Sequence, residues 1–75
     1  MLQEVQSKNI KAIEYDNLKK ELCVQMLSSQ DFLYVYLSVP KDIYMKFLNA
    51  ESKGKFFLKN IKGQFDYVKI PKDMH

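Results

Sequence analysis

The sequence has no arginine and no tryptophan, and it contains only one cysteine, one histidine, two glycines and two prolines. A lone cysteine, Cys23, excludes an internal disulfide and a cysteine-based zinc site, and its place within an expected strand favours inert packing. The lone histidine, His75, is the last residue. No glycine-rich phosphate loop, metal-ligand spacing or catalytic pair of side chains is present. We therefore expect a protein that is not an enzyme and that requires no cofactor or metal.

Long apolar runs are also missing. None approaches the roughly 20 residues that cross a bilayer, and the opening MLQEVQSK lacks the apolar core of a signal peptide. We therefore expect a cytoplasmic protein with no membrane span. The chain of 75 residues is 47% hydrophobic and 28% charged, which is typical of a folded domain. We expect one domain over residues 5–70, with tails at 1–4 and 71–75, and a core small enough that a homodimer would stabilise it.

The charge is mildly basic. The formal net charge is +3, and all twelve basic residues are lysines. Lysine neutralises phosphate as a point charge, whereas arginine supplies the bidentate contacts that usually read sequence. If this chain binds a nucleic acid, we expect little sequence selectivity.

Three segments with alternating apolar residues predict strands at 10–16, 21–27 and 32–39. Polar turns at 17–20 and 28–31 separate them, which predicts an antiparallel meander. In the third segment, Tyr34 and Tyr36 share one face and Val35 takes the other. Both faces of this strand are apolar or aromatic, so it is either covered on both sides or presents one apolar face to a partner.

Helices follow the third strand. Pro40 holds the preceding residue extended and favours a helix over 41–50, with an apolar stripe at three- and four-residue spacings. Ser52 is a suitable cap for a second helix over 53–62, which Gly63 would end. Residues 65–70 predict a short strand or an ordered tail. The expected fold is α+β, in which a three-stranded antiparallel meander is covered on one face by two helices, with 65–70 as a candidate fourth strand.

The order of these features carries a family resemblance. SKNIKAIEY at 7–15, the Tyr-x-Tyr pair, Val39-Pro40 and NAESKGKFF at 49–57 together resemble the KTSC family, which is named after the C-terminal domain of lysyl-tRNA synthetase. The resemblance spans about residues 5–68. The family includes domains appended to lysyl-tRNA synthetases and stand-alone forms in bacteria and phages, and this chain is similar to the stand-alone form.

The resemblance implies RNA binding, by association with a tRNA-charging enzyme. Two departures from the family pattern stand out. The segment MLSSQDFL at 26–33 lacks the glycine of the usual short hairpin, and Val35 and Leu37 replace residues that are often polar. The resemblance thus implies a buried tyrosine face and additional apolar surface behind it.

Two sets of residues are candidates for binding sites. Lys55, Lys59 and Lys62 fall at i, i+4 and i+7 and would form a basic stripe on the second helix, with Lys53 nearby, for contact with phosphates. Tyr34 and Tyr36 would either stack on bases or pack in the core. The lysine stripe would otherwise be an ordinary solvated helix face.

The second set is apolar. Its members would form an exposed patch on the sheet, for self-association or a protein partner, unless a terminal segment folds over it. We thus expect a small binding module, either for RNA or, as the alternative, for a protein, as in a small phage or bacterial inhibitor. The candidate interface residues are Leu33, Val35, Leu37, Cys23 and Leu27.

Overall fold

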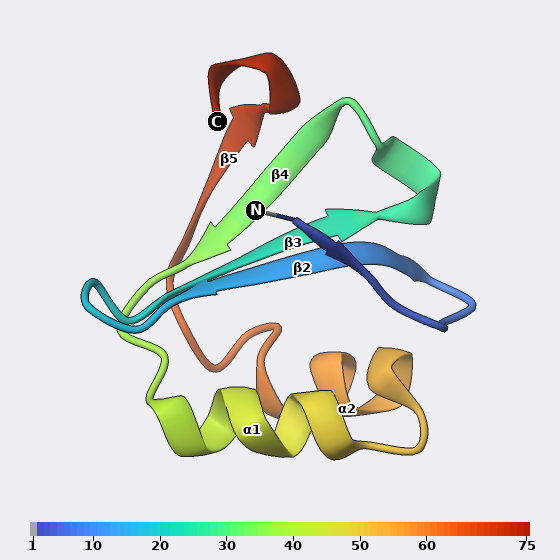
Figure 1. Cartoon of the computed structure of the whole chain (residues 1–75), viewed down its shortest axis with the longest axis vertical. Helices are drawn as coiled ribbons and strands as arrows, with labels where there is room; N and C mark the ends of the chain where they lie inside the picture. The colour runs from blue at the N-terminus through green and yellow to red at the C-terminus, as the bar shows by residue number, and fades with distance from the viewer. Residues whose placement is uncertain (1) are drawn as a thin grey trace.

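The computed structural model describes residues 2–75, which form one antiparallel sheet with two helices on one face (Figure 1). The five strands lie in chain order, each paired with its sequence neighbour. The strands are β1 (Gln3–Glu4), β2 (Ile10–Asp16), β3 (Glu21–Met26), β4 (Phe32–Tyr36) and β5 (Tyr67–Pro71). The helices are α1 (Lys41–Asn49) and α2 (Lys53–Asn60), with short 3-10 helices η1 (Leu27–Ser29) and η2 (Lys72–Met74).

The predicted α+β class is confirmed, but the predicted number of strands is too low. Gln3 and Glu4, expected in the N-terminal tail, pair with Ile13 and Ala12 of β2. The candidate strand at 65–70 is present as β5, which pairs with β4, and η2 follows it where a tail was expected. A two-residue strand shows no alternation in its sequence, so β1 could be found only through its pairing.

A bulge in β2 changes which residues face the helices. Simple alternation places Ile10 and Ile13 on opposite faces, but the register of β2 on β3 shifts between Ile10 and Ala12. The extra residue brings Ile10 and Ile13 to the same side, where both are fully buried in the core beneath the helices. Ala12 and Glu14 lie on the other side, which we call the outer face.

The alternation predicted for β4 is confirmed. Tyr36 and Tyr34 pair with Leu22 and Val24, and these four residues face the helices. β4 ends three residues before the predicted position because Ser38 takes a left-handed conformation with φ of 56°. That turn directs the chain through buried Val39 and Pro40 into α1.

The two helices begin where the sequence predicts. The hydroxyl oxygen of Ser52 accepts a hydrogen bond from the backbone N–H of Lys55, which confirms the predicted cap of α2. α2 ends at Asn60, two residues before the predicted end, because Ile61 leaves the helical conformation with φ of −120°. Lys62 therefore lies in a turn beyond the helix, and Gly63 takes a φ of +82° there.

The core lies between the helices and the sheet. Phe47 of α1 and Phe57 of α2 are buried against the sheet, together with Tyr36. The Tyr15 hydroxyl donates a 2.6 Å hydrogen bond to the carbonyl of Val39, and the Tyr15 ring stacks on Tyr44 of α1 at 4.4 Å. Within residues 2–75, no helix has both the length and the apolar character of a membrane span.

Candidate nucleic-acid interface

Both predicted tyrosines and one of the four predicted lysines, Lys62, line a hollow between β4, β5 and the end of α2. The hollow has a volume of about 280 Å³. Tyr36 forms part of its lining at 3% exposure, whereas Tyr67 of β5 stands at its edge with 54% of its surface exposed. We call this the tyrosine hollow; its lining residues are Met26, Ser28, Ser29, Tyr34, Tyr36, Phe57, Lys62 and Tyr67.

The rings in the tyrosine hollow pack on one another. Tyr67 lies 5.3 Å from Tyr36 and 5.5 Å from Tyr34, centroid to centroid, and Phe57 meets Tyr36 edge-on at 5.5 Å. Burial, with smaller contributions from the neighbouring phenols Tyr67 and Tyr34, raises the pKa of Tyr36 to about 12. Tyr36 therefore stays neutral and is a core residue, while Tyr34 is half-buried. Of the three tyrosines, Tyr67 offers the most accessible ring.

Lys69 is a second cation, besides Lys62, that lies beside these rings. Tyr34 pairs with Lys69 across β4 and β5, so the two side chains share the face of the helices. The Lys69 ammonium lies 4.4 Å from the centroid of the Phe32 ring and 5.8 Å from that of Tyr34. At such distances a cation is attracted to the ring face, so Lys69 holds positive charge next to the tyrosine hollow.

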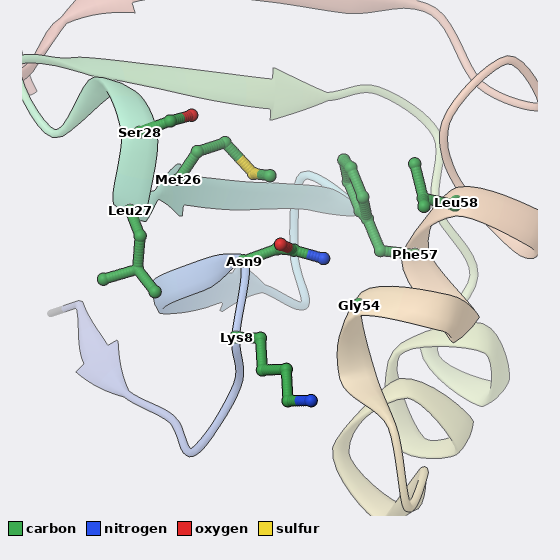
Figure 2. Close-up of a pocket in the computed structure, with 8 residues that line it drawn as sticks. All are labelled: Lys8, Asn9, Met26, Leu27, Ser28, Gly54, Phe57 and Leu58. Carbon is green, nitrogen blue, oxygen red and sulfur yellow. The ribbon is translucent and has the colours of Figure 1, made fainter.

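A larger hollow adjoins the tyrosine hollow, between α2 and the connection from β1 to β2 (Figure 2). Its volume is about 510 Å³, and it shares Met26, Ser28 and Phe57 with the tyrosine hollow. The Asn9 amide points towards α2, and the Met26 thioether points into the space between them. We call this the central hollow; its other lining residues are Lys8, Leu27, Gly54 and Leu58.

A third hollow continues past the N-terminal end of α2. It shares Lys8, Asn9 and Leu58 with the central hollow and has a volume of about 440 Å³. Lys53 and Lys55, two of the four predicted lysines, both line it. We call this the lysine hollow; its remaining lining residues are Gln6, Ser7, Glu51 and Ser52.

The predicted stripe of lysines is divided by the early end of α2. Lys53 and Lys55 line the lysine hollow, whereas Lys62 lines the tyrosine hollow beyond the helix. Lys59 lines none of the three hollows. Because α2 ends at Asn60, Lys62 does not lie on the helix as predicted, whereas Lys55 and Lys59 do. Three of the four predicted lysines line the adjoining hollows.

Local hydrogen bonds place the walls of these hollows. The Ser7 hydroxyl oxygen accepts from the backbone N–H groups of Asn9 and Ile10, each at 3.2 Å, which fixes the turn that carries Lys8. On the other wall, the buried Gln25 amide donates a 2.9 Å hydrogen bond to the carbonyl of Gln30. That bond holds the turn after η1, the 3-10 helix that carries Ser28.

Gly54 lies where α2 passes close to the Asn9 side chain. A Cβ built on Gly54 would lie 2.9 Å from the Asn9 side-chain nitrogen, which is closer than real Cβ atoms come. The absence of a side chain therefore lets α2 approach the connection from β1 to β2. Gly54 and Asn9 both line the central hollow.

The outer face of the sheet differs from the predicted open apolar patch. Leu33 and Cys23 are buried at 0% and 4% exposure, so both are inaccessible in the single chain. Leu27 was expected in β3 beside Cys23, but it begins η1 and lines the central hollow. Val35 and Leu37 are half-buried. The accessible apolar surface on this face is smaller than the sequence predicts, and Val68 of β5, at 48% exposure, adds to it.

The C-terminus covers part of the outer face. His75 and Glu14 lie 2.9 Å apart, Nε2 to Oε1, above a hollow that Cys23, Val35 and Ile70 also line. Glu14, Asp16 and Glu21 give this hollow three carboxylates against one lysine, Lys19. Burial raises the pKa of the Cys23 thiol to about 11, with Glu14 adding to the shift, so this thiol stays protonated at neutral pH. Within residues 2–75, no cluster of His, Cys, Asp and Glu could hold a metal ion.

Replacing Glu14 with Gln should alter stability at acid pH. The hydrogen bond from His75 holds the pKa of Glu14 below its ordinary value of 4.5. A lowered pKa stabilises the fold above the unfolded pKa, and this contribution is lost as the pH falls through the folded value. In thermal melts followed by circular dichroism, we expect wild type to exceed Glu14→Gln in Tm near neutral pH, with the difference shrinking below pH 4.5. A difference that stays constant into that range would contradict the pairing.

Fold and site together define a small α+β domain with a connected basic surface on the side of its helices. Comparison with known proteins names the family. The KTSC domain model matches residues 6–65, so the chain belongs to the KTSC domain family, as the resemblance implied. A crystal structure of a KTSC domain protein from Yersinia pestis is 38% identical, with a TM-score of 0.88, and the match covers 93% of this chain and 96% of that one.

A tRNA ligase contains a similar segment. The chain is 38% identical over 61 residues to a lysine–tRNA ligase from Nostoc sp., and the match covers 81% of this chain. It covers only 10% of the ligase, so the chain spans about a tenth of that relative's length. The similarity is thus to one small part of the enzyme.

Sequence reasoning missed Tyr67, Lys69 and Lys8. Tyr67 and Lys69 lie in the segment whose alternation predicts a strand, but the sequence does not show that this strand pairs with β4. Lys8 lies in a turn that approaches α2 only in the folded chain. One signal in the sequence could have pointed to Tyr67. If the segment that contains Tyr67 pairs with β4, Tyr67 extends the aromatic face formed by Tyr34 and Tyr36.

Proposed function

We propose that this protein is a non-catalytic binding module for RNA, which it contacts on the side of its helices with little sequence selectivity. The observation that carries the proposal is the difference in charge between the two sides of the sheet. The three hollows near α2 are lined by four lysines and one glutamate, whereas the hollow on the outer face has three carboxylates and one lysine. A polyanion is attracted to the first side and repelled by the second.

The lysines near α2 are available to phosphates. Within the described residues, none of the ammonium groups of Lys8, Lys53, Lys55 and Lys62 has an ion-pair partner. Tyr67 adds an accessible ring on which a base can stack, and such stacking tolerates any base. The similarity to part of a lysine–tRNA ligase supports RNA as the polyanion.

Binding of wild-type protein to a labelled single-stranded RNA should depend strongly on salt. Four lysine contacts release counterions with a slope of about −0.7 each for a single strand, so log K should fall with log[salt] at a slope of about −3. Affinity should then fall about 60-fold between about 50 and about 200 mM salt. Fluorescence anisotropy at several salt concentrations measures the slope.

The same preparation tests the second candidate, a self-associating or protein-binding module. Its support is the outer-face apolar surface around Val68, which lies opposite Val35 in β4. Light scattering gives the native mass. A dimer that binds no RNA at low salt would overturn the RNA proposal and favour this candidate. RNA binding that does not change with salt concentration would also contradict the proposed lysine–phosphate contacts.

A further inference from the structure

We propose that the three hollows near α2 form one continuous path for a single unpaired RNA strand. This inference rests on the proposed function and adds the form of the ligand and its route. It also assigns a binding role to Lys8, which the sequence does not single out. The path runs from the lysine hollow, across the N-terminal end of α2, to Tyr67.

The continuity follows from shared walls. The lysine and central hollows share Lys8, Asn9 and Leu58, and the central and tyrosine hollows share Met26, Ser28 and Phe57. The central hollow thus adjoins both others, and together the three border α2 along one side. Figure 2 shows the middle of the path, with Lys8 and Asn9 on one wall and Gly54, Phe57 and Leu58 of α2 on the other.

The lining distinguishes an unpaired strand from a duplex. Met26, Phe57 and Leu58 give the central hollow apolar atoms, and Tyr67 gives the far end an aromatic ring. An unpaired strand exposes bases that can rest on such atoms while its phosphates reach lysines at the rim. A duplex keeps its bases inside and presents phosphates, so it would use the lysines but gain nothing from the apolar lining.

Leu58 is the best position for a test. It lines both the lysine and central hollows, and its side chain is 56% exposed, so a charged replacement should leave the core intact. Leu58→Glu places a carboxylate in the middle of the path. Leu18→Glu is the matched control, because Leu18 is 94% exposed in the turn between β2 and β3 and lines none of the three hollows. Both variants carry the same change in charge.

Anisotropy with an RNA of about ten nucleotides, within the range that single small domains cover, compares the variants. We expect Leu58→Glu to weaken binding about tenfold and Leu18→Glu about twofold or less. For the same sequence annealed to its complement, we expect weaker binding to wild type and a smaller difference between the variants. Thermal melts check that both variants are folded. If Leu58→Glu does not fold, Ser28→Glu replaces it, because Ser28 is exposed and lines the central and tyrosine hollows.

Each other outcome decides against the path. Equal loss in the two variants, with salt-dependent binding by wild type, overturns the path but leaves the RNA proposal standing. Equal or tighter binding of the duplex overturns the unpaired strand. Poly-glutamate and unlabelled RNA are also compared as competitors of the labelled RNA. If poly-glutamate displaces the labelled RNA as effectively as unlabelled RNA does, the surface binds acidic peptides, and the inference is overturned. Failure of wild type to bind any RNA removes the proposed function itself.

Discussion

Phe47→Ala is expected to destabilise the fold by about 3–5 kcal/mol, the usual cost of removing a buried phenylalanine. Phe47 has no exposed surface, and its ring lies 5.8 Å from Phe56 and 6.4 Å from Phe57. Phe47 is therefore a buried side chain of α1 that packs against α2. A domain of this size is stable by roughly 4–11 kcal/mol, so the substitution should remove a large part of that margin.

Urea denaturation followed by circular dichroism measures the effect as a lower midpoint with a similar slope. Met45→Ala is the control, because Met45 lies on the same helix but is 43% exposed. We expect it to change the free energy of unfolding by less than about 1 kcal/mol. Similar midpoints for the two variants would mean that α1 and α2 do not share the core described above.

The experiment also bears on the site. α2 supplies Phe57 and Leu58 to the central hollow, and Phe47 holds α2 against the sheet through Phe57. The RNA path thus depends on packing between the helices. Loss of binding in a partly unfolded Phe47→Ala chain is expected for that reason and carries no information about contacts.

The parts of the fold that the sequence predicts are those with a strong local signal. The two helices follow from an apolar stripe, from Pro40 and from the Ser52 cap, and all three signals act over a few residues. β4 follows from its alternation, which also places Tyr34 and Tyr36 on the face of the helices. Each of these features is set by neighbours in the chain.

The features that the sequence does not predict depend on pairing between distant segments. β1 has only two residues, and the bulge in β2 is visible only from its register on β3. Burial of Leu33 on the outer face could not be predicted, because the sequence of β4 does not show which residues pack over Leu33. Lys62 was predicted on the stripe, but the end of α2 at Asn60 moved it to the tyrosine hollow. The sequence supplies the candidate lysines, which stay a prediction as a binding set, while their distribution over the hollows is visible only in the folded chain.

That distribution leads to the largest expected effect on binding. Replacing Lys53, Lys55 and Lys62 together with Gln should weaken RNA binding about 100-fold at low salt, equivalent to about 2.7 kcal/mol. All three line the proposed path, and each is expected to neutralise one phosphate. Their loss should also make the slope of log K against log[salt] shallower by about 2.

Two controls separate position from net charge. Changing Lys19, Lys46 and Lys72 to Gln removes the same charge, but none of these three lysines lines the path. Because the phosphates stay within reach of the path lysines, we expect this variant to lose less than about fivefold and to keep nearly the wild-type slope. Lys59→Gln is the finer control, since Lys59 belongs to the stripe that the sequence predicts but lines none of the three hollows. A Lys59→Gln loss as large as that of Lys62→Gln would mean that RNA follows the exposed side of α2, and the predicted stripe would then describe the interface better than the hollows do.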